Sequence, residues 1–141
     1  MIMPTIPVTY FSDFVRGYFD GDGCVSLERS KGSKGQAIIR RLTVVFTSGS
    51  KQFLKVLARQ LAEHTGIQRV PVWLSNCSFQ LRYSTTDSTK LFCLFYKQVR
   101  PGLYLRRKFD IFAQYFQLRP SRVTDGIARI LDVFQHGHVV K

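Results

Sequence analysis

The segment FVRGYFDGDG, residues 14–23, decides the fold, because a helical pattern in it runs directly into paired carboxylates. Thr9 is in place to cap a helix that begins at Tyr10 and continues into this segment. The helix delivers Asp20 and Asp22 at its C-terminal end, where the partial negative charge of a helix disfavours a carboxylate unless a cation accompanies it. The pattern therefore favours a metal ion at the end of this helix.

Two other interpretations of residues 20–23 compete with such a metal site. A calcium loop starting at Asp20 would need Gly at its sixth place and Glu at its twelfth, where this chain has Val25 and Lys31. A plain turn accounts for the two Asp-Gly dipeptides and stays open as an alternative. The turn does not explain why Gly17 and Gly21 leave a bare stripe along the helix, along which another helix can approach closely.

The net charge of +12 is concentrated in the middle of the 141-residue chain. Residues 24–122 hold eighteen basic and only four acidic side chains. A field of this size attracts polyanions, and displacement of counterions from nucleic acid is its usual use. A basic helix on a membrane surface is the competing interpretation, but the basic residues are spread over many segments instead of one helix face. We therefore expect a nucleic-acid partner and no membrane.

Composition predicts a single soluble, intracellular domain over residues 1–141. The length is that of one domain, and 45% hydrophobic residues allow an ordinary core. No apolar run reaches the roughly 20 residues of a membrane span, and the N-terminus lacks the pattern of a secretory signal. Cys24, Cys77 and Cys93 are expected to be reduced, because neither they nor the three histidines have the spacing of a zinc site.

Hydrophobic periodicity predicts an α+β fold built from two hairpins and several helices. Four strands are expected, at about residues 25–28, 38–47, 67–74 and 78–84, with turns at 29–35 and Ser75-Asn76. Helices are expected over 10–19, from Ser50 to Gly66, from Thr86 or Asp87 to Arg100-Pro101-Gly102, from Leu105 to Arg119-Pro120, and from about Thr124. Local hairpins imply a four-stranded antiparallel sheet with helices on one face.

The two faces of this sheet differ in chemistry. Alternation places Leu42, Val44 and Phe46 on the face toward the helices. The other face carries groups that can bond to base edges or phosphates, namely Ser26, Glu28, Arg41, Thr43, Gln80 and Arg82.

At this point the chain resembles a known family, the LAGLIDADG homing endonucleases. Residues 15–23 stand in the nine places of the LAGLIDADG motif, and Arg16 replaces its usual small second residue. The hairpin after the motif, residues 45–54 leading into a helix, and residues 103–108 leading into a later helix also look like the family. The resemblance covers most of residues 10–118 and implies an αββαββα domain with a saddle-shaped sheet and C-terminal helices.

The resemblance implies a homing endonuclease, an enzyme of intron mobility that hydrolyses both strands of a specific DNA site. Asp22 matches the catalytic carboxylate that binds Mg²⁺, and the backbone carbonyl of Gly21 is the adjacent candidate ligand. Mn²⁺ or Ca²⁺ can occupy the same site. Asp20 matches a structural position that caps or orients the motif helices.

Two further catalytic positions follow from the resemblance. Ser48, with Ser50 as the alternative, stands where a polar residue usually positions water. Lys108 is the first candidate for a basic residue beside the phosphate, Arg106 is the second, and Arg107 also qualifies. The competing interpretation of these three basic residues is a solvated helix start.

A single motif in the chain implies two chains in the enzyme. The resemblance predicts a homodimer in which the helices pack about a two-fold axis at Gly17 and Gly21, so that two copies of Asp22 cut a pseudo-palindromic target. The residues expected to face bases in the major groove are Ser26, Glu28, Ser30, Arg41, Thr43, Gln80 and Arg82. Lys31, Lys34 and Lys51 are expected at phosphates, and Arg69 is a further candidate. A register error of one residue would exchange the two faces.

Other functions stay open at the level of sequence. Relatives on the same fold include intron-RNA maturases and regulators that bind DNA without cutting it. A basic RNA- or DNA-binding domain unrelated to the family is a third hypothesis, in which residues 20–23 form a turn. An intein is disfavoured, because the sequence has no nucleophile at residue 1 and no terminal His-Asn.

Overall fold

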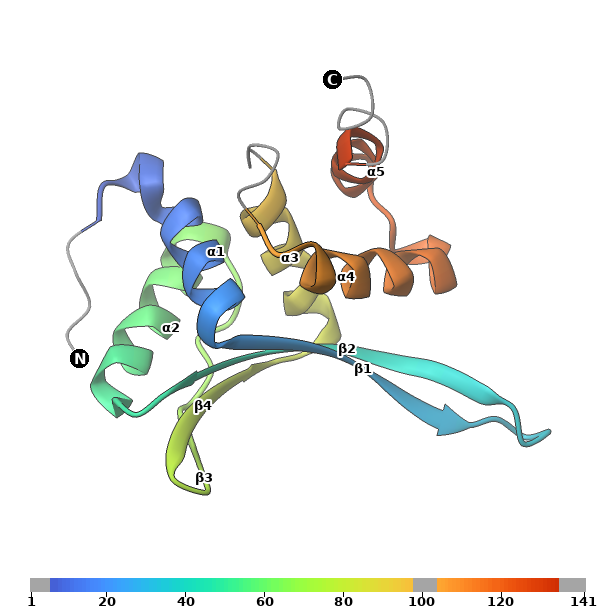
Figure 1. Cartoon of the computed structure of the whole chain (residues 1–141), viewed down its shortest axis with the longest axis horizontal. Coiled ribbons are helices and arrows are strands. Elements are labelled where there is room, and N and C mark those ends of the chain that lie inside the picture. The colour runs from blue at the N-terminus through green and yellow to red at the C-terminus, as the bar shows by residue number, and fades with distance from the viewer. Residues whose placement is uncertain (1–5, 98–103, 135–141) are drawn as a thin grey trace.

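In the described part of the chain, helices lie on one face of a curved, four-stranded antiparallel sheet (Figure 1). The computed structural model describes residues 6–97 and 104–134. Its elements are a 3₁₀ helix Val8–Tyr10, α1 (Phe11–Asp22), β1 (Gly23–Lys31), β2 (Ala37–Ser48), α2 (Lys51–Thr65), β3 (Trp73–Ser75), β4 (Ser78–Tyr83), α3 (Thr85–Tyr96), α4 (Arg106–Leu118), a 3₁₀ helix Pro120–Arg122 and α5 (Asp125–Asp132). The expected α+β fold with an antiparallel sheet is confirmed.

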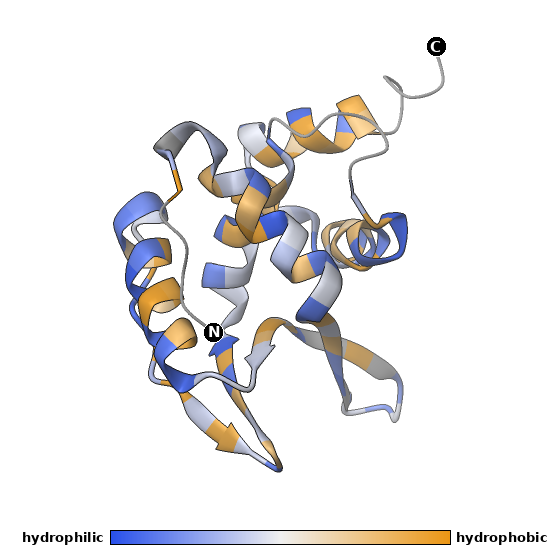
Figure 2. Ribbon diagram, turned by 60° about the vertical axis from the view of Figure 1, so that its left-hand side comes forward, coloured by the Kyte–Doolittle hydropathy of each residue, from blue (hydrophilic) through white to orange (hydrophobic). Residues whose placement is uncertain are grey.

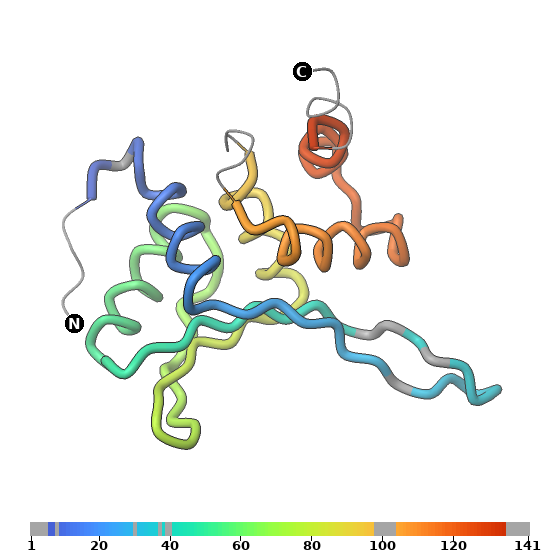
Figure 3. The backbone as a smooth tube through the Cα atoms, viewed as in Figure 1, coloured from blue at the N-terminus to red at the C-terminus, as the bar shows by residue number. Residues whose placement is uncertain are grey.

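The sheet joins its two hairpins through the central strands β2 and β4, in the order β1-β2-β4-β3. Phe46 pairs with Gly23 of β1 on one side and with Leu81 of β4 on the other. The β1–β2 hairpin is the longer one, and its outer part extends away from the helices (Figure 3). A bulge between Glu28 and Arg29 shifts the register within this extension.

The core lies between the sheet and the helices and is rich in aromatic side chains. Phe19 of α1 stacks on Phe95 of α3 at 4.6 Å between ring centroids, and both contact Phe46 of the sheet edge-on. Phe112 of α4 packs against the same cluster. Figure 2 shows hydrophobic and hydrophilic residues alternating along the strands and helices, as amphipathic elements require. Helix α1 is therefore held by its apolar side against both the sheet and α3.

Hydroxyl groups of α3 extend the hydrogen bonding of β2 where β4 ends. The backbone N–H of Val44 donates to the Ser88 hydroxyl at 3.1 Å, and that hydroxyl donates to the carbonyl of Tyr83 at 3.2 Å. The N–H of Leu42 donates to the Thr85 hydroxyl at 3.2 Å. These bonds fix α3 on the sheet, because buried backbone groups need partners.

Several element ends agree with the sequence-based prediction. Ser50 caps α2 by accepting from the N–H of Phe53, and Gly66 follows the helix in the left-handed conformation, with φ of 75°. Thr124 caps α5 in the same way as Ser50 caps α2. Helix α4 ends at Leu118, just before Arg119-Pro120.

Other element ends were predicted wrongly, each for a local reason. Thr9 lies in the 3₁₀ helix before α1 and does not cap it; Tyr10 holds that position without a side-chain bond. Helix α1 continues through Asp22 instead of ending at residue 19. Helix α3 begins at Thr85, so Asp87 lies in its first turn.

Strand β3 is much shorter than the predicted 67–74. Pro71 has no N–H to donate to a ladder, and pairing with β4 begins only at Trp73. The turn that follows contains Asn76 at a positive φ of 53°. The predicted stop at Arg100-Pro101-Gly102 lies outside the described residues.

Candidate active site and nucleic-acid interface

The acidic end of α1 is the centre of the candidate site. Asp22 is the last residue of the helix and is exposed, and Gly23 begins β1 directly after it. The helix buries Phe11, Val15 and Phe19 on one side. Gly17 and Gly21 are exposed, and a Cβ atom added to either would meet nothing within 4 Å. The glycine stripe is therefore an open surface of this chain, and Asp22 lies at its end.

Lys108 of α4 is turned inward and binds the end of α1. Its Nζ donates to the carbonyls of Phe19 at 2.6 Å, Asp20 at 3.0 Å and Gly23 at 2.6 Å, and its residue is only 8% exposed. Burial lowers the pKa of the Lys108 amine. The three carbonyls accept from all three N–H groups of the ammonium. The Lys108 side chain is therefore bound to the backbone and does not extend into solvent. It compensates the negative end of the helix and keeps α1 helical through Asp22.

The groups that remain at this helix end fit a hard divalent cation. Lys108 takes the carbonyls of Phe19, Asp20 and Gly23, and thus leaves the Gly21 carbonyl to other partners. The last carbonyls of a helix have no intrahelical donor. An exposed carboxylate and a backbone carbonyl are oxygen ligands of the kind Mg²⁺ accepts alongside water and phosphate. Within the described ranges, no three His, Cys, Asp or Glu side chains gather as a metal site.

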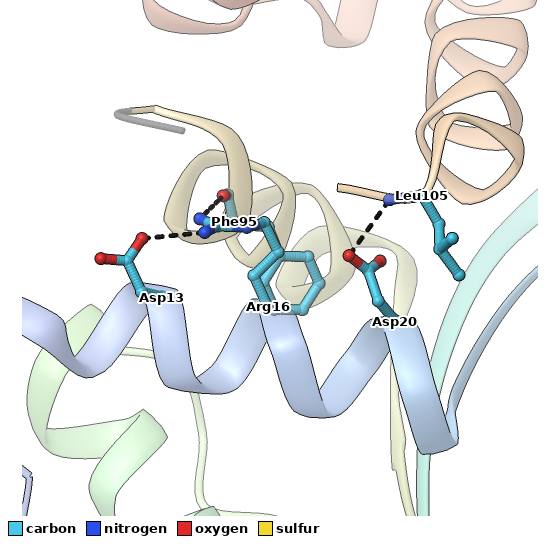
Figure 4. A network of polar contacts seen from close by, with 5 residues as sticks. All are labelled: Asp13, Arg16, Asp20, Phe95 and Leu105. Atoms are coloured by element: carbon cyan, nitrogen blue, oxygen red, sulfur yellow. Dashed lines mark hydrogen bonds and ion pairs between the residues drawn. The ribbon is translucent and has the colours of Figure 1, made fainter. Parts of the chain in front are cut away.

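Asp20 connects α1 to the start of α4. Its Oδ2 accepts from the backbone N–H of Leu105 at 3.1 Å (Figure 4). Its Oδ1 is buried without a hydrogen-bond partner, and burial raises the pKa of this carboxyl above its ordinary value. Asp20 points toward α4 and away from the open side where Asp22 lies, which supports the structural role expected for it.

The end of β2 lies beside the same helix. Tyr18 of α1 donates its hydroxyl to the carbonyl of Thr47 at 2.5 Å. Ser48 is buried, and its hydroxyl accepts from the N–H of Ser50, while the Ser50 hydroxyl caps α2. Both serines serve the turn between β2 and α2. Alternation along β2 turns the half-exposed Thr47 to the open face of the sheet, opposite to the buried Ser48.

The basic residues that begin α4 point to different places. Arg106 is exposed, and its Nε donates to Asp110 at 3.0 Å within the same helix. Arg107 is also exposed. Of the three basic residues at this helix start, only Lys108 reaches the backbone of α1, so Arg106 and Arg107 are the ones whose charge faces solvent.

The open face of the sheet brings the predicted base-contacting residues together. Cross-strand pairs join Ser26 with Thr43, Glu28 with Arg41, and Gln80 with Thr47, so their side chains share one face. Arg41 and Glu28 lie 3.9 Å apart, and Arg82 donates to Gln80 at 3.4 Å. A hollow of about 400 Å³ on this face is lined by Glu28, Arg41, Thr43, Arg82 and the start of α3.

The remaining predicted contacts lie at the margins of this face. Lys31 and Lys34 are exposed at the tip of the β1–β2 hairpin, and Lys51 is exposed at the start of α2. Arg69 is exposed in the segment between α2 and β3. Ser30 pairs with Ile38 in the outer hairpin, but its side chain lies outside what the structure describes.

Comparison with known proteins gives a family for this geometry. A family model described as a LAGLIDADG-like domain matches residues 12–70. Over this range the chain is similar to a LAGLIDADG-like domain. The likeness inferred from residues 14–23 is therefore confirmed, and the matched range includes the glycine stripe, Asp22, the long hairpin and α2.

Solved structures extend the likeness of this LAGLIDADG-like domain to nearly the whole chain. The homing endonuclease I-LtrWI, in a crystal structure with its target DNA, is 15% identical, with a TM-score of 0.60 over 90% of this chain. I-GzeII, also in complex with a DNA target, is 17% identical with a TM-score of 0.56, and I-TnaI is 20% identical with a TM-score of 0.52. At these identities the likeness is one of fold. No curated protein matches the sequence.

The chain is close to half as long as two of these neighbours. It spans 44% of the I-LtrWI chain and 41% of the I-GzeII chain, but 84% of the I-TnaI chain. None of the helices within the described ranges is long and apolar enough to cross a membrane.

Arg16, the departure from the motif, is accommodated away from the glycine stripe. Its guanidinium donates to the carbonyl of Phe95 at 3.1 Å and pairs with Asp13 at 2.9 Å (Figure 4). Phe95 lies in the last turn of α3, where a cation stabilises the unpaired carbonyls. The long side chain thus joins α1 to α3 and leaves Gly17 and Gly21 uncovered.

Sequence reasoning missed three residues of the open face, Cys24, Thr47 and Trp73. Cys24 pairs with Val45, Thr47 pairs with Gln80, and Gln80 pairs in turn with Trp73. Strand alternation alone could have found Cys24 and Thr47. Trp73 required the register across the turn at Asn76, which the sequence does not fix.

Proposed function

We propose that this protein is a site-specific, divalent-metal-dependent DNA endonuclease that acts as a homodimer on a pseudo-palindromic duplex. The observation that carries the proposal is the position of Asp22, an exposed acid at the end of α1, beside a sheet whose open face is polar and basic. A basic surface without an acid would account for binding alone. An isolated carboxylate next to a phosphate-binding surface needs a cation, and a cation is what phosphodiester hydrolysis uses.

Different residues of the chain bind the metal, orient water and contact the phosphate. Asp22 and the Gly21 carbonyl hold the metal, and Lys108 fixes the helix end that presents them. A divalent cation bound there stabilises charge on the scissile phosphate and lowers the pKa of an attacking water. Thr47, on the open face at the end of β2, is the polar group that orients water, while the buried Ser48 supports the turn into α2. Arg106 or Arg107 adds positive charge near the phosphate.

The half-length relation to DNA-bound neighbours supports a two-chain enzyme. Each copy has one Asp22, and cutting two strands takes two such groups. Packing of the open stripes at Gly17 and Gly21 about a two-fold axis brings the two acids together at the middle of the duplex. Two sheets then continue along the major groove on either side, each reading one half-site.

The proposal is tested with a randomised duplex library incubated with Mg²⁺ and the wild-type chain, Asp22→Asn, or Glu63→Gln. Glu63 is an exposed acid of α2 and serves as the matched control for loss of one carboxylate. We expect symmetric sites to be cut by the wild type and by Glu63→Gln. Asp22→Asn should bind the same sites with unchanged affinity and leave them intact. Cleavage by Asp22→Asn at the wild-type rate would refute the assignment, and binding without cleavage by the wild type would favour a non-cutting regulator.

A further inference from the structure

Trp73 is a large apolar side chain that the fold leaves in solvent. It is the only tryptophan of the sequence and is 57% exposed on the short edge strand β3. A side chain of this size is normally well buried, and exposed tryptophans with one polar edge are enriched at binding surfaces. Its neighbour Leu74 is 71% exposed, but strand alternation turns it to the opposite face.

The strand register places Trp73, Gln80 and Thr47 side by side in a row across the open face. This row ends next to the C-terminal end of α1, where Asp22 lies. Trp73 pairs with Gln80, and Gln80 pairs with Thr47. Gly23 pairs with Phe46, so Asp22 stands one residue further along, at the level of Thr47. Strands lie about 4.8 Å apart, so the indole and the end of α1 are separated by only about three strand spacings. The exposed indole therefore belongs to the surface next to the candidate active site.

We propose that Trp73 is a specificity-determining residue that makes an apolar contact with a thymine methyl group in the major groove. This inference rests on the proposed function. The polar groups of the row, Gln80 and the Thr47 hydroxyl, can satisfy donors and acceptors of base edges, whereas the indole of Trp73 supplies by far the largest apolar surface of the row. The C5-methyl of thymine is the apolar feature that the major groove displays, and a flat, uncharged ring matches it better than it matches a phosphate.

The first test uses the emission of Trp73 itself. A mixed-sequence duplex is titrated into the wild-type chain without divalent cation, while the anisotropy of a dye on the duplex reports binding independently. We expect the emission to change in step with the anisotropy. Binding seen by anisotropy with unchanged emission overturns the role of Trp73 and leaves the proposed function standing. Absence of any duplex binding refutes the proposed function instead. An emission change on concentrating the protein alone assigns the surface to a contact between copies and also overturns the inference.

The second test compares the sites selected by the wild type, Trp73→Ala and Leu74→Ala from a randomised duplex library. We expect a thymine preference in each half-site for the wild type and for Leu74→Ala, and its loss in Trp73→Ala. Affinity of Trp73→Ala for the wild-type site should fall about tenfold, the usual effect of one lost base contact. The dependence of duplex affinity on salt concentration should be unchanged, because no phosphate contact is lost. Identical selected sites for all three proteins, or no thymine preference in the wild type, overturn the inference.

Discussion

At the scale of one residue, Lys108 shows how a buried ammonium can stabilise backbone carbonyls at a helix end. Its three hydrogen bonds end at carbonyls of residues 85 to 89 positions away in the sequence, so α4 closes the end of α1. The Nζ also lies 4.9 Å from the centroid of the Phe19 ring. A cation at this place both pairs with the helix end and covers an aromatic face.

Replacing Lys108 with Met should destabilise the fold. Three carbonyls then lose a charged donor, and we expect the free energy of unfolding to fall by about 2–3 kcal/mol in urea denaturation. Arg107→Met, which removes an exposed charge one residue earlier on α4, is the control and should change stability by less than about 0.5 kcal/mol. Equal effects of the two substitutions would contradict a structural role for Lys108.

The acid residues of the site could be predicted from the sequence, but the partner of the helix end could not. Asp20 and Asp22 follow a helical pattern locally, and the meaning of an acid at a helix C-terminus needs no tertiary information. The direction of the Lys108 side chain depends on how α4 crosses α1. Read along the chain, the basic triplet gave three candidates for a residue beside the phosphate, with Lys108 first, and only the packing separates Lys108 from Arg106 and Arg107.

Helix α3 and the sheet form a unit at the scale of elements. The Ser88 hydroxyl is fully buried and connects β2 with the end of β4. Sequence periodicity predicted the helix and both strands, because each has its own apolar pattern. It did not predict where α3 begins, since that point is set by hydroxyl contacts to β2.

Ser88→Ala should weaken the packing of α3 on the sheet. The substitution leaves the N–H of Val44 and the carbonyl of Tyr83 unpaired in the interior, which costs about 1–3 kcal/mol of unfolding free energy. Thr89→Ala removes a hydroxyl that bonds only within the helix, to the carbonyl of Thr86, and should have a small effect. Thermal unfolding of both variants gives the comparison, and a Ser88→Ala variant as stable as Thr89→Ala would contradict this account.

Alkylation of the three cysteines can report where a duplex covers the protein. Cys24 is exposed there beside Asp22, Cys77 is exposed in the β3–β4 turn, and Cys93 of α3 is partly buried. Burial raises the pKa of the Cys93 thiol, so less thiolate forms at neutral pH. We expect an alkylating reagent to modify Cys24 and Cys77 first, and bound duplex to protect Cys24 much more than Cys77. Equal protection of the two, measured by mass spectrometry of peptides, would place the duplex elsewhere.

At the scale of the whole molecule, the exposed glycine face of α1 is the surface through which two copies can assemble. At Gly17 and Gly21 of α1, nothing in the described chain lies within 4 Å of an added Cβ atom, while Arg16 and Asp20 lie on the side toward α3 and α4. Helix α1 thus has one face for its own fold and another that a second copy can use. A substitution on the glycine face can therefore separate assembly from folding.

Gly17→Leu should leave the fold intact and abolish dimer formation. No atom obstructs a side chain at this position, and replacing a helical glycine gains up to about 1 kcal/mol. We expect an unchanged or higher melting temperature, a monomer in sedimentation, and no double-strand cleavage. Ala128→Leu, which places the same side chain at an exposed position of α5, should keep the wild-type assembly state. A wild-type chain that stays monomeric with and without DNA would contradict the proposed homodimer.

In the proposed complex, the repeat of side chains along the β1–β2 hairpin sets a fixed spacing of contacts for a duplex on the open face. Side chains on one face of a strand recur about every 6.6 Å, and base pairs stack about every 3.4 Å, so each step along the strand covers nearly two base pairs. A substituted base pair then removes one contact, whereas an inserted base pair displaces every contact beyond it. In the proposed complex, the bulge between Glu28 and Arg29 would shift this count once along each hairpin. Insertions in a target are therefore more damaging the closer they lie to its centre.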